Sequence, residues 1–202
     1  MSEKENCSIE LMTPEMAEEV LDILARAYAT NPINRAALES SSIERNRAFF
    51  RIGLQTMNGS RYVAKIGGEI VGMAHWVDSE KCQPPALDKL KLAPAMIRDL
   101  GLKSSLRIMK WLSAWSAHDP KLKHSHFGPI GVDPKVQGKG VGSALLRAHC
   151  EDLDRRKLMG YLETDRPENV PIYEKFGYRV INQTEVLGLM NYFMERKPSS
   201  QA

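Results

Sequence analysis

The sequence predicts an α/β domain of the mixed (α+β) type, and three features of the chain support this. Strand-like segments with a period of two alternate with helix-like segments along most of the 202 residues. Gly67-Gly68 joins two of the strand-like segments as a two-residue hairpin turn. A glycine-rich turn over 138–142 opens a long helix. We therefore expect a single domain over residues 1–202.

The expected elements follow one another in a regular order. Thr13 and Pro14 supply the cap and the first position of a helix that runs to about Ala29, where Asn31-Pro32 ends it. Strands are expected over residues 8–12, 61–66, 69–77, 126–132, 161–164, 179–185 and 189–194, and further helices over 42–57, 141–157 and 167–176. Residues 197–202 are expected to form a flexible tail.

Residues of about 79–120 form a separate helical insertion in this prediction. Pro84-Pro85 precedes its first part, Pro94 opens the next, and Gly101 begins the break before the last. Apolar side chains recur there at steps of three and four residues, which predicts one buried stripe made of Leu102, Leu106, Met109, Leu112 and Trp115. Trp111 and Trp115 either stack on a substrate or belong to the core, and their spacing favours the core.

Composition excludes several classes of protein. The 28 basic and 25 acidic residues give a net charge of +3, too small to indicate a nucleic-acid partner. The three cysteines are far apart and form no CxxC pair, which predicts reduced thiols in a cytoplasmic protein rather than a zinc site or disulfides. The polar N-terminus lacks the apolar segment of a secretory signal. No apolar run approaches the roughly 18–20 residues of a membrane span, so no membrane partner is expected.

The segment Gln137-Gly138-Lys139-Gly140-Val141-Gly142-Ser143 carries the sharpest functional pattern. A glycine-rich turn at the start of a helix points several backbone N–H groups at one place, and the helix dipole adds positive potential there. Such a turn binds phosphate or pyrophosphate. The pattern fits neither the GxxxxGK[ST] of a P-loop nor the GxGxxG of a dinucleotide site.

Together with the strand before it, this turn resembles the GNAT superfamily of acyl-CoA-dependent N-acetyltransferases. Tyr161-Leu162-Glu163-Thr164-Asp165, Asn169 and Tyr173-Glu174-Lys175-Phe176-Gly177-Tyr178 resemble the family's next strand and helix, and the 63–76 hairpin resembles its earlier strands. The resemblance implies acetyl-CoA as cofactor and a mixed, mostly antiparallel, twisted sheet with a splayed central parallel pair and helices on both faces. Relatives often form homodimers, and the sequence neither requires nor excludes one.

The resemblance also implies which residues hold the cofactor. The pantetheine arm would bond to the strand backbone, and the pyrophosphate would lie on the amides of the turn. Lys139 either contacts phosphate or is simply solvated, and Asn169 either contacts the arm or satisfies local backbone. The implied set is Ile130, Gly131, Val132, Gln137, Gly138, Lys139, Gly140, Val141, Gly142, Ser143, Asn169 and Tyr173.

Catalytic roles follow from the same resemblance. Tyr173 matches the family's general acid, which protonates the leaving thiolate. His126 stands where some relatives carry a carboxylate, and it is either the base or a structural histidine. Glu163 is the other candidate, as base, as ligand of a cationic acceptor or as a structural carboxylate. His118, His124 and His126 suggest a metal, but no further spacing supports one, so none is expected.

The acceptor side is less determined. The family pattern points to Tyr28, Asn31, Arg35, Glu163, Tyr192 and Phe193 as acceptor-binding residues. The function implied is transfer of the acetyl group of acetyl-CoA to a primary amine of a small molecule, by direct attack in a ternary complex. A peptide or protein N-acetyltransferase and a non-catalytic acyl-CoA sensor are the alternatives. The identity of the amine, and acetyl against a longer acyl group, stay open.

Overall fold

A seven-stranded sheet with strand order β1-β2-β3-β4-β5-β7-β6 forms the centre of the protein. The strands are β1 (Ser8–Leu11), β2 (Ser60–Ile66), β3 (Glu69–Asp78), β4 (His124–Val132), β5 (Met159–Thr164), β6 (Arg179–Val186) and β7 (Leu189–Arg196). All neighbouring strands run antiparallel except β4 and β5, which are parallel. The sheet confirms the expected mixed, mostly antiparallel arrangement.

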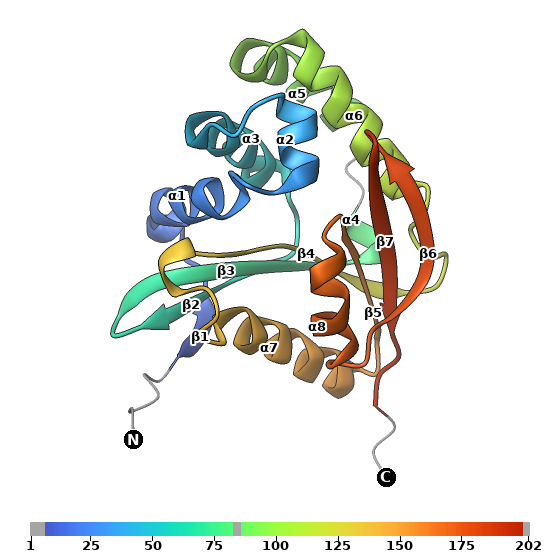
Figure 1. Ribbon diagram of the computed structural model, residues 1–202. Helices are drawn as coiled ribbons and strands as arrows, with labels where there is room; N and C mark the ends of the chain where they lie inside the picture. The colour runs from blue at the N-terminus through green and yellow to red at the C-terminus, as the bar shows by residue number, and fades with distance from the viewer. Residues whose placement is uncertain (1–6, 83–85, 200–202) are drawn as a thin grey trace.

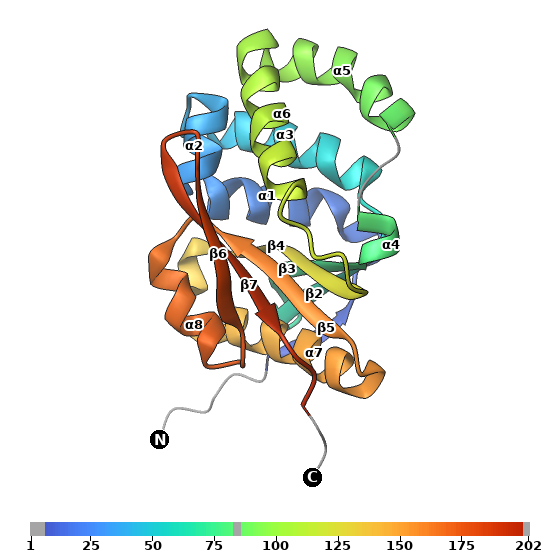
Figure 2. The same ribbon diagram turned by 90° about the vertical axis from the view of Figure 1, so that its right-hand side faces the viewer.

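Helices cover both faces of the sheet, as expected (Figure 1). On one face lie α1 (Ala17–Tyr28), α2 (Pro32–Leu38) and α3 (Ile43–Thr56), with α5 (Ala86–Leu100) and α6 (Leu102–Ser116) beyond them; on the other lie α7 (Val141–Arg156) and α8 (Val170–Glu174). The short helix α4 (Ser79–Cys82) follows β3 directly. Figure 2 shows α5 as the outermost helix of this stack.

The computed structural model describes residues 7–82 and 86–199, with the backbone alone for 86–90. The polar N-terminal segment and Pro84-Pro85 therefore lie outside the described residues. At the other end, the third residue of the predicted 197–202 tail makes a contact with the domain: the amide of Ser199 donates to Asp154 Oδ1 (2.7 Å). Residues 200–202 of that tail lie outside the described part of the chain.

Two apolar layers fix the helices to the sheet. Leu145 and Leu146 of α7 pack with Phe127 of β4 on one side. Leu24 of α1 and Met73 of β3 pack together on the other. Burying a side chain of this size stabilises a fold by about 1.5–3 kcal/mol, so these layers hold the strands in place between the helices.

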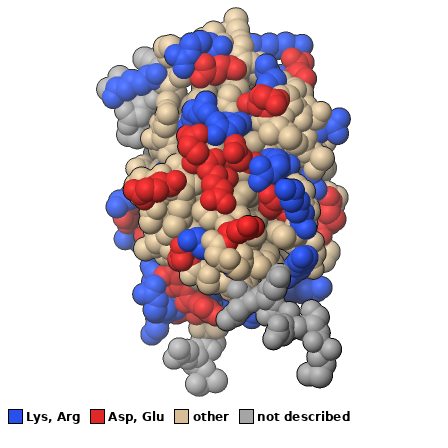
Figure 3. Space-filling view, turned by 90° about the vertical axis from the view of Figure 1, so that its left-hand side faces the viewer, with Lys and Arg blue, Asp and Glu red and all other residues tan. Residues whose placement is uncertain are grey.

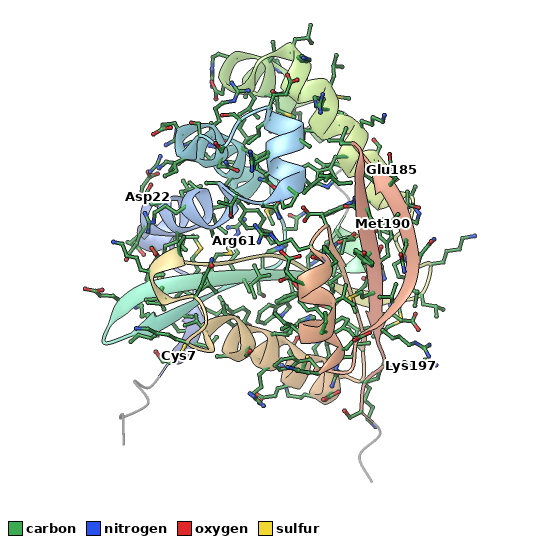
Figure 4. All side chains as sticks on the ribbon, viewed as in Figure 1. Cys7, Asp22, Arg61, Glu185, Met190 and Lys197 are labelled. Atoms are coloured by element: carbon green, nitrogen blue, oxygen red, sulfur yellow. The ribbon has the colours of Figure 1, made fainter. Side chains whose placement is uncertain are left out.

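Local capping explains where several helices begin and end. The Ser42 hydroxyl accepts from the amide of Arg45 and caps α3 at its start. At the other end, Arg61 reaches across from β2 and donates to the carbonyls of Leu54 and Met57 (2.7 and 2.6 Å; Figure 4 labels Arg61). These contacts satisfy carbonyls that the end of a helix leaves free.

The sequence prediction missed α2. Asn31-Pro32 was expected only to end the preceding helix, but it also starts the next one: the Asn31 side chain accepts from the Asn34 amide, and Pro32 takes the first helical position. An Asn followed by Pro is a strong helix start, because Pro lacks the N–H that the first turn leaves unused.

The predicted boundary at Pro94 was wrong. Pro94 lies inside α5, which continues from Ala86 to Leu100. The side chain of Pro94 is exposed, so the carbonyl that it deprives of a partner can be solvated.

The predicted buried stripe of α6 was wrong for four of its five residues. Leu102, Leu106, Met109 and Leu112 are 59%, 57%, 56% and 48% exposed, whereas Ile108 is buried. The reason lies in α2, whose last carbonyls draw polar groups of α6 inward. Ser104 donates to the Leu38 carbonyl (3.3 Å) and Arg107 to the Ala36 carbonyl (2.7 Å). These bonds rotate the apolar stripe away from the core.

The surface charges of the structure agree with the small net charge of the sequence. Figure 3 shows acidic and basic side chains interspersed over one face of the molecule. Among the described helices, none combines the length and the apolar character that crossing a membrane requires. All three cysteines are present as free thiols.

Candidate active site

The central parallel strands separate part-way along their length, as expected. β4 and β5 pair only at His124–Met159, Ser125–Gly160 and His126–Tyr161. Beyond this point β4 stays paired with β3 as far as Val132, and β5 stays paired with β7 as far as Thr164. The backbone of β4 beyond His126 therefore faces a wedge-shaped opening rather than a neighbouring strand.

The glycine-rich turn lies beyond the far end of β4, at the start of α7. Gly138 and Gly140 have φ values of 80° and 86°, a left-handed conformation that favours glycine, and a Cβ on either would meet no atom within 4 Å. Gly140 is the cap of α7 and offers no side-chain oxygen. The first amides of the 16-residue helix are thus left for an outside acceptor.

Two contacts with α1 hold β4 and the turn in position. Asp133 accepts from Arg26 (3.1 and 2.5 Å) and from the Lys135 amide (3.0 Å). Burial opposes the charge of Asp133, yet these donors lower the pKa of the carboxyl group. Gly131 has no room for a side chain, since its Cβ would come within 2.7 Å of Leu24 Cδ2.

One cleft of about 1400 Å³ connects the turn, the strand opening and the helices above it. It gathers nearly every residue expected to hold the cofactor. These are Ile130, Gly131, Val132, Gln137, Gly138, Gly140, Val141, Gly142, Ser143, Asn169 and Tyr173. Lys139 is exposed and does not line the cleft.

The expected catalytic residues His126 and Glu163 meet where β4 and β5 part. Nε2 of His126 lies 2.7 Å from Oε2 of Glu163. The Glu163 side chain is only 2% exposed, and its Oε1 makes no hydrogen bond within the described residues. Burial alone would lower the pKa of His126, but the charges of Glu163 and Asp119 and the contact with Cys82 raise it to about 10.

Tyr173 on α8 lines the same cleft and is buried. Burial, with the nearby charge of Asp165, raises the pKa of Tyr173 to about 12. Its phenol therefore keeps its proton at neutral pH. Tyr28 lies close by and donates to the Ile130 carbonyl (3.1 Å).

The residues expected on the acceptor side divide into two groups. Tyr28, Asn31 and Glu163 line the cleft. Arg35 is exposed beside a separate shallow pocket, Tyr192 pairs with Thr164 and Gln183 within the sheet, and both lie outside the cleft. Phe193 is fully buried and stacks on His118, with ring centroids 4.0 Å apart.

Asp165 was missed by the sequence reasoning. It accepts from Asn31 Nδ2 (3.0 Å) and from the Ile33 amide (2.8 Å), and so fixes the start of α2 against the end of β5. Its position directly after a predicted strand was the available sequence signal. Trp111 and Trp115 line the cleft but are held by protein partners, Phe49 and Asn191, as the core interpretation expected.

A family model described as acetyltransferase (GNAT) family matches residues 18–178, which is most of the chain. The chain belongs to the acetyltransferase (GNAT) family. It is therefore an acetyltransferase, an enzyme of the acyltransferase class, and its acetyl donor is acetyl-CoA. The split sheet is the GNAT fold, as the resemblance implied.

Solved structures support the fold at low sequence identity. An acetyltransferase from Corynebacterium glutamicum, described as histone acetyltransferase HPA2 and related acetyltransferase, is 20% identical, with a TM-score of 0.70 over 96% of this chain and 98% of that chain. Arylalkylamine N-acetyltransferase 2 from Aedes aegypti is 16% identical, with a TM-score of 0.70 over 96% and 100%. The ribosomal-protein-S18-alanine N-acetyltransferase from Escherichia coli is 14% identical, with a TM-score of 0.58 over 98% and 97%.

The cleft of this GNAT acetyltransferase has the features that acetyl-CoA requires. Open space above Gly138 and Gly140 admits a phosphate to the helix amides. The unpaired edge of β4 offers backbone groups for an extended arm, starting one residue beyond the His126–Tyr161 pair. The turn and the open edge of β4 thus suit two parts of one long anionic molecule.

Proposed function

We propose that this acetyltransferase transfers the acetyl group of acetyl-CoA to the primary amine of a small molecule, by direct attack in a ternary complex. The observation that carries the proposal is Oε1 of Glu163, which has no hydrogen-bond partner among residues 7–82 and 86–199. A buried carboxylate oxygen without a donor is costly, and an amine in the cleft would supply the missing N–H.

Each residue of the site then has a definite task. Acetyl-CoA, when bound, supplies the acetyl thioester. Glu163 Oε1 orients the amine and accepts the proton that the amine must lose, while the protonated His126 holds the carboxylate in place. Amides of β4 beyond His126 are placed to donate to a developing oxyanion. Tyr173 holds a proton on its phenol oxygen for the departing sulfur.

The walls of the acceptor end favour a small amine. Trp111 and Trp115 line this part of the cleft, and α2 is fixed beside it by Asp165. The Aedes neighbour is named for arylalkylamines, which matches an aromatic wall. The half-exposed stripe of α6, which also lines the cleft, favours the alternative of a peptide or protein acceptor, as in the Escherichia coli neighbour's name.

Thiol release from acetyl-CoA, measured with a panel of acceptors, tests the proposal. The panel contains alkylamines, arylalkylamines, diamines and short peptides with a free N-terminus. We expect a small amine to have the highest kcat/KM, and Glu163→Gln to lower that value by about 10²- to 10⁴-fold. Glu185→Gln, which changes an exposed carboxylate on β6, is the matched control. A peptide preferred over every small amine would establish the alternative.

A further inference from the structure

Four side chains that commonly bind metals meet beside the acceptor end of the cleft. Sγ of Cys82 and ring nitrogens of His124 and His126 all lie within 4.8 Å of one another. Oδ2 of Asp119 is 3.8 Å from Sγ of Cys82, and Oδ1 is 3.9 Å from Nδ1 of His126. A tetrahedron with zinc–ligand bonds of about 2.0–2.3 Å has edges of about 3.3–3.8 Å. The Cys82, His124 and His126 atoms would therefore close in by up to about 1 Å on binding, and one oxygen of Asp119 would turn toward them.

His124 is oriented for a ligand through Nε2. Its Nδ1 lies 2.8 Å from the Leu122 carbonyl oxygen, so Nδ1 carries the hydrogen and donates it. The lone pair is then on Nε2. That nitrogen is buried, since His124 is only 1% exposed, and it makes no hydrogen bond within the described part of the chain. Buried polar atoms normally have a hydrogen-bond or metal partner.

His126 has the complementary arrangement. Its Nε2 bonds to the buried Glu163 carboxylate (2.7 Å), which leaves Nδ1 facing Asp119 and the Cys82 cluster. Histidines that bind zinc usually donate their other ring N–H to a carboxylate or a backbone carbonyl. Glu163 and the Leu122 carbonyl provide one acceptor of each kind.

We infer that Cys82, Asp119, His124 and His126 form a binding site for one borderline-soft divalent cation, with Zn²⁺ as the best match. A thiolate, two imidazoles and a carboxylate suit zinc in ligand type and number, and their two negative charges balance the cation. His118, which the sequence grouped with the other two histidines, is not part of it. Its Nδ1 donates to the Ala114 carbonyl, and its Nε2 lies 3.2 Å from the Thr184 hydroxyl.

The position of the site has a consequence that rests on the proposed function. His126 belongs to the cation cluster, and the Glu163 carboxylate that it contacts belongs to the acceptor end of the cleft. A bound cation and an amine therefore compete through this hydrogen-bonded pair. Zn²⁺ should inhibit acetyl transfer, and a saturating acceptor should relieve that inhibition.

The test uses the full-length chain after treatment with a chelator. Zn²⁺ is titrated by calorimetry, and Co²⁺ is titrated while the absorption spectrum is recorded. We expect one equivalent of each, with a thiolate-to-cobalt charge-transfer band. Cys82→Ser should abolish the band, and His124→Asn should weaken Zn²⁺ binding at least 10-fold. Cys7→Ser, another half-buried free thiol, is the matched control and should retain both.

A variant that removes only the carboxylate that orients His126 distinguishes a preformed metal site from nonspecific binding of the metal to the Cys82 thiol. Glu163→Gln should keep the stoichiometry and the band but weaken Zn²⁺ binding by about 10- to 100-fold, the usual effect of losing a group that orients a ligand. Circular dichroism checks that each variant folds. Absence of the band in the wild type, or its persistence in Cys82→Ser, would overturn the site.

The activity readout distinguishes the two proposals. Zn²⁺ that binds without slowing acetyl transfer would refute the competition while the site stands. A chain that binds Zn²⁺ but acetylates no amine in the panel would refute the proposed function and leave the site intact.

Discussion

Nε2 of His126 and Oε2 of Glu163 lie 2.7 Å apart at the point where β4 and β5 separate. Parallel strands that part after a few residues leave their last side chains in an opening rather than in a sheet. Glu163 and Asp119 keep the imidazole protonated in spite of its burial, with a pKa of about 10. At neutral pH the pair is therefore an imidazolium beside a carboxylate, and the carboxylate is the member of the pair that can accept a proton.

Removing the charge of Glu163 should lower the pKa of His126. An opposite charge within about 4–6 Å typically raises the pKa of a histidine by about 1–3 units. Without it, the charge of Asp119 and the contact with Cys82 are left to oppose burial. We expect the pKa in Glu163→Gln to fall by at least about one unit. The measurement is an NMR titration of the imidazole Cε1 proton in the presence of a chelator. Glu185→Gln is the control, and an equal pKa in wild type and Glu163→Gln would contradict the assignment.

Gly140→Asp should weaken acetyl-CoA binding at least 10-fold. The new carboxylate would stand over amides that are placed to receive phosphate, and a Cβ at φ 86° adds strain of about 1–2 kcal/mol. Calorimetric titration of acetyl-CoA and of free CoA measures the effect. Gly188→Asp is matched in strain, because Gly188 has φ 81° and open space around its Cβ in the β6–β7 turn. Equal losses in the two variants would mean that strain, not the phosphate site, is responsible.

Tyr173→Phe should lower kcat by about 10²- to 10⁴-fold with little change in the KM for acetyl-CoA, since it removes a proton donor and keeps the ring. Steady-state rates at varied acetyl-CoA give both constants. Tyr192→Phe tests another tyrosine that the sequence suggested. Because Tyr192 lies in the sheet outside the cleft, it should leave kcat/KM unchanged. A rise in KM alone in Tyr173→Phe would indicate a binding role.

The sequence predicted what depends on neighbours along the chain. The β2–β3 hairpin, α1 and α7 were located to within a few residues, because periodicity and caps are local. The glycine turn was found for the same reason. The position of β7 between β5 and β6, and the approach of Cys82 and Asp119 to β4, depend on contacts between distant segments. No spacing in the sequence encodes them, so the cation cluster was not predicted.

The helix α6 shows how one missed element misdirects another prediction. Its apolar stripe was correctly periodic, but periodicity does not say which face meets the core when two faces carry apolar residues. Ile108 and Trp111 form the second face, and α2, which was not predicted, contacts that side through Ser104 and Arg107.

The two faces of α6 should therefore respond differently to truncation. Ile108 is 1% exposed, so Ile108→Ala should lower the free energy of unfolding by about 2–5 kcal/mol. Leu106 is 57% exposed, so Leu106→Ala should change it by only about 0.5 kcal/mol. Urea unfolding of the two variants measures the difference. The reverse order would restore the buried stripe that the sequence suggested.

His149 should make the stability of the protein depend on pH. The ring is fully enclosed: Nδ1 hydrogen-bonds with the Tyr178 hydroxyl (3.2 Å), and Nε2 with the Ser125 hydroxyl (3.2 Å). Burial, aided by the positive charge of Arg196, lowers the pKa of His149 to about 3. In the unfolded chain a histidine has a pKa of about 6.5.

Between the native pKa of about 3 and the unfolded pKa of about 6.5, His149 is protonated in the unfolded chain but neutral in the native state. The contribution of His149 to stability is therefore complete above pH 6.5 and is lost as the pH falls, by up to about 1.4 kcal/mol per pH unit. His149→Gln lacks this dependence, so its free energy of unfolding should fall less steeply from pH 6.5 to 5.0 than that of the wild type. Urea unfolding at several pH values in this interval measures both slopes. Parallel slopes would show that His149 is protonated in the native state, and that its bonds to Tyr178 and Ser125 do not require a neutral ring.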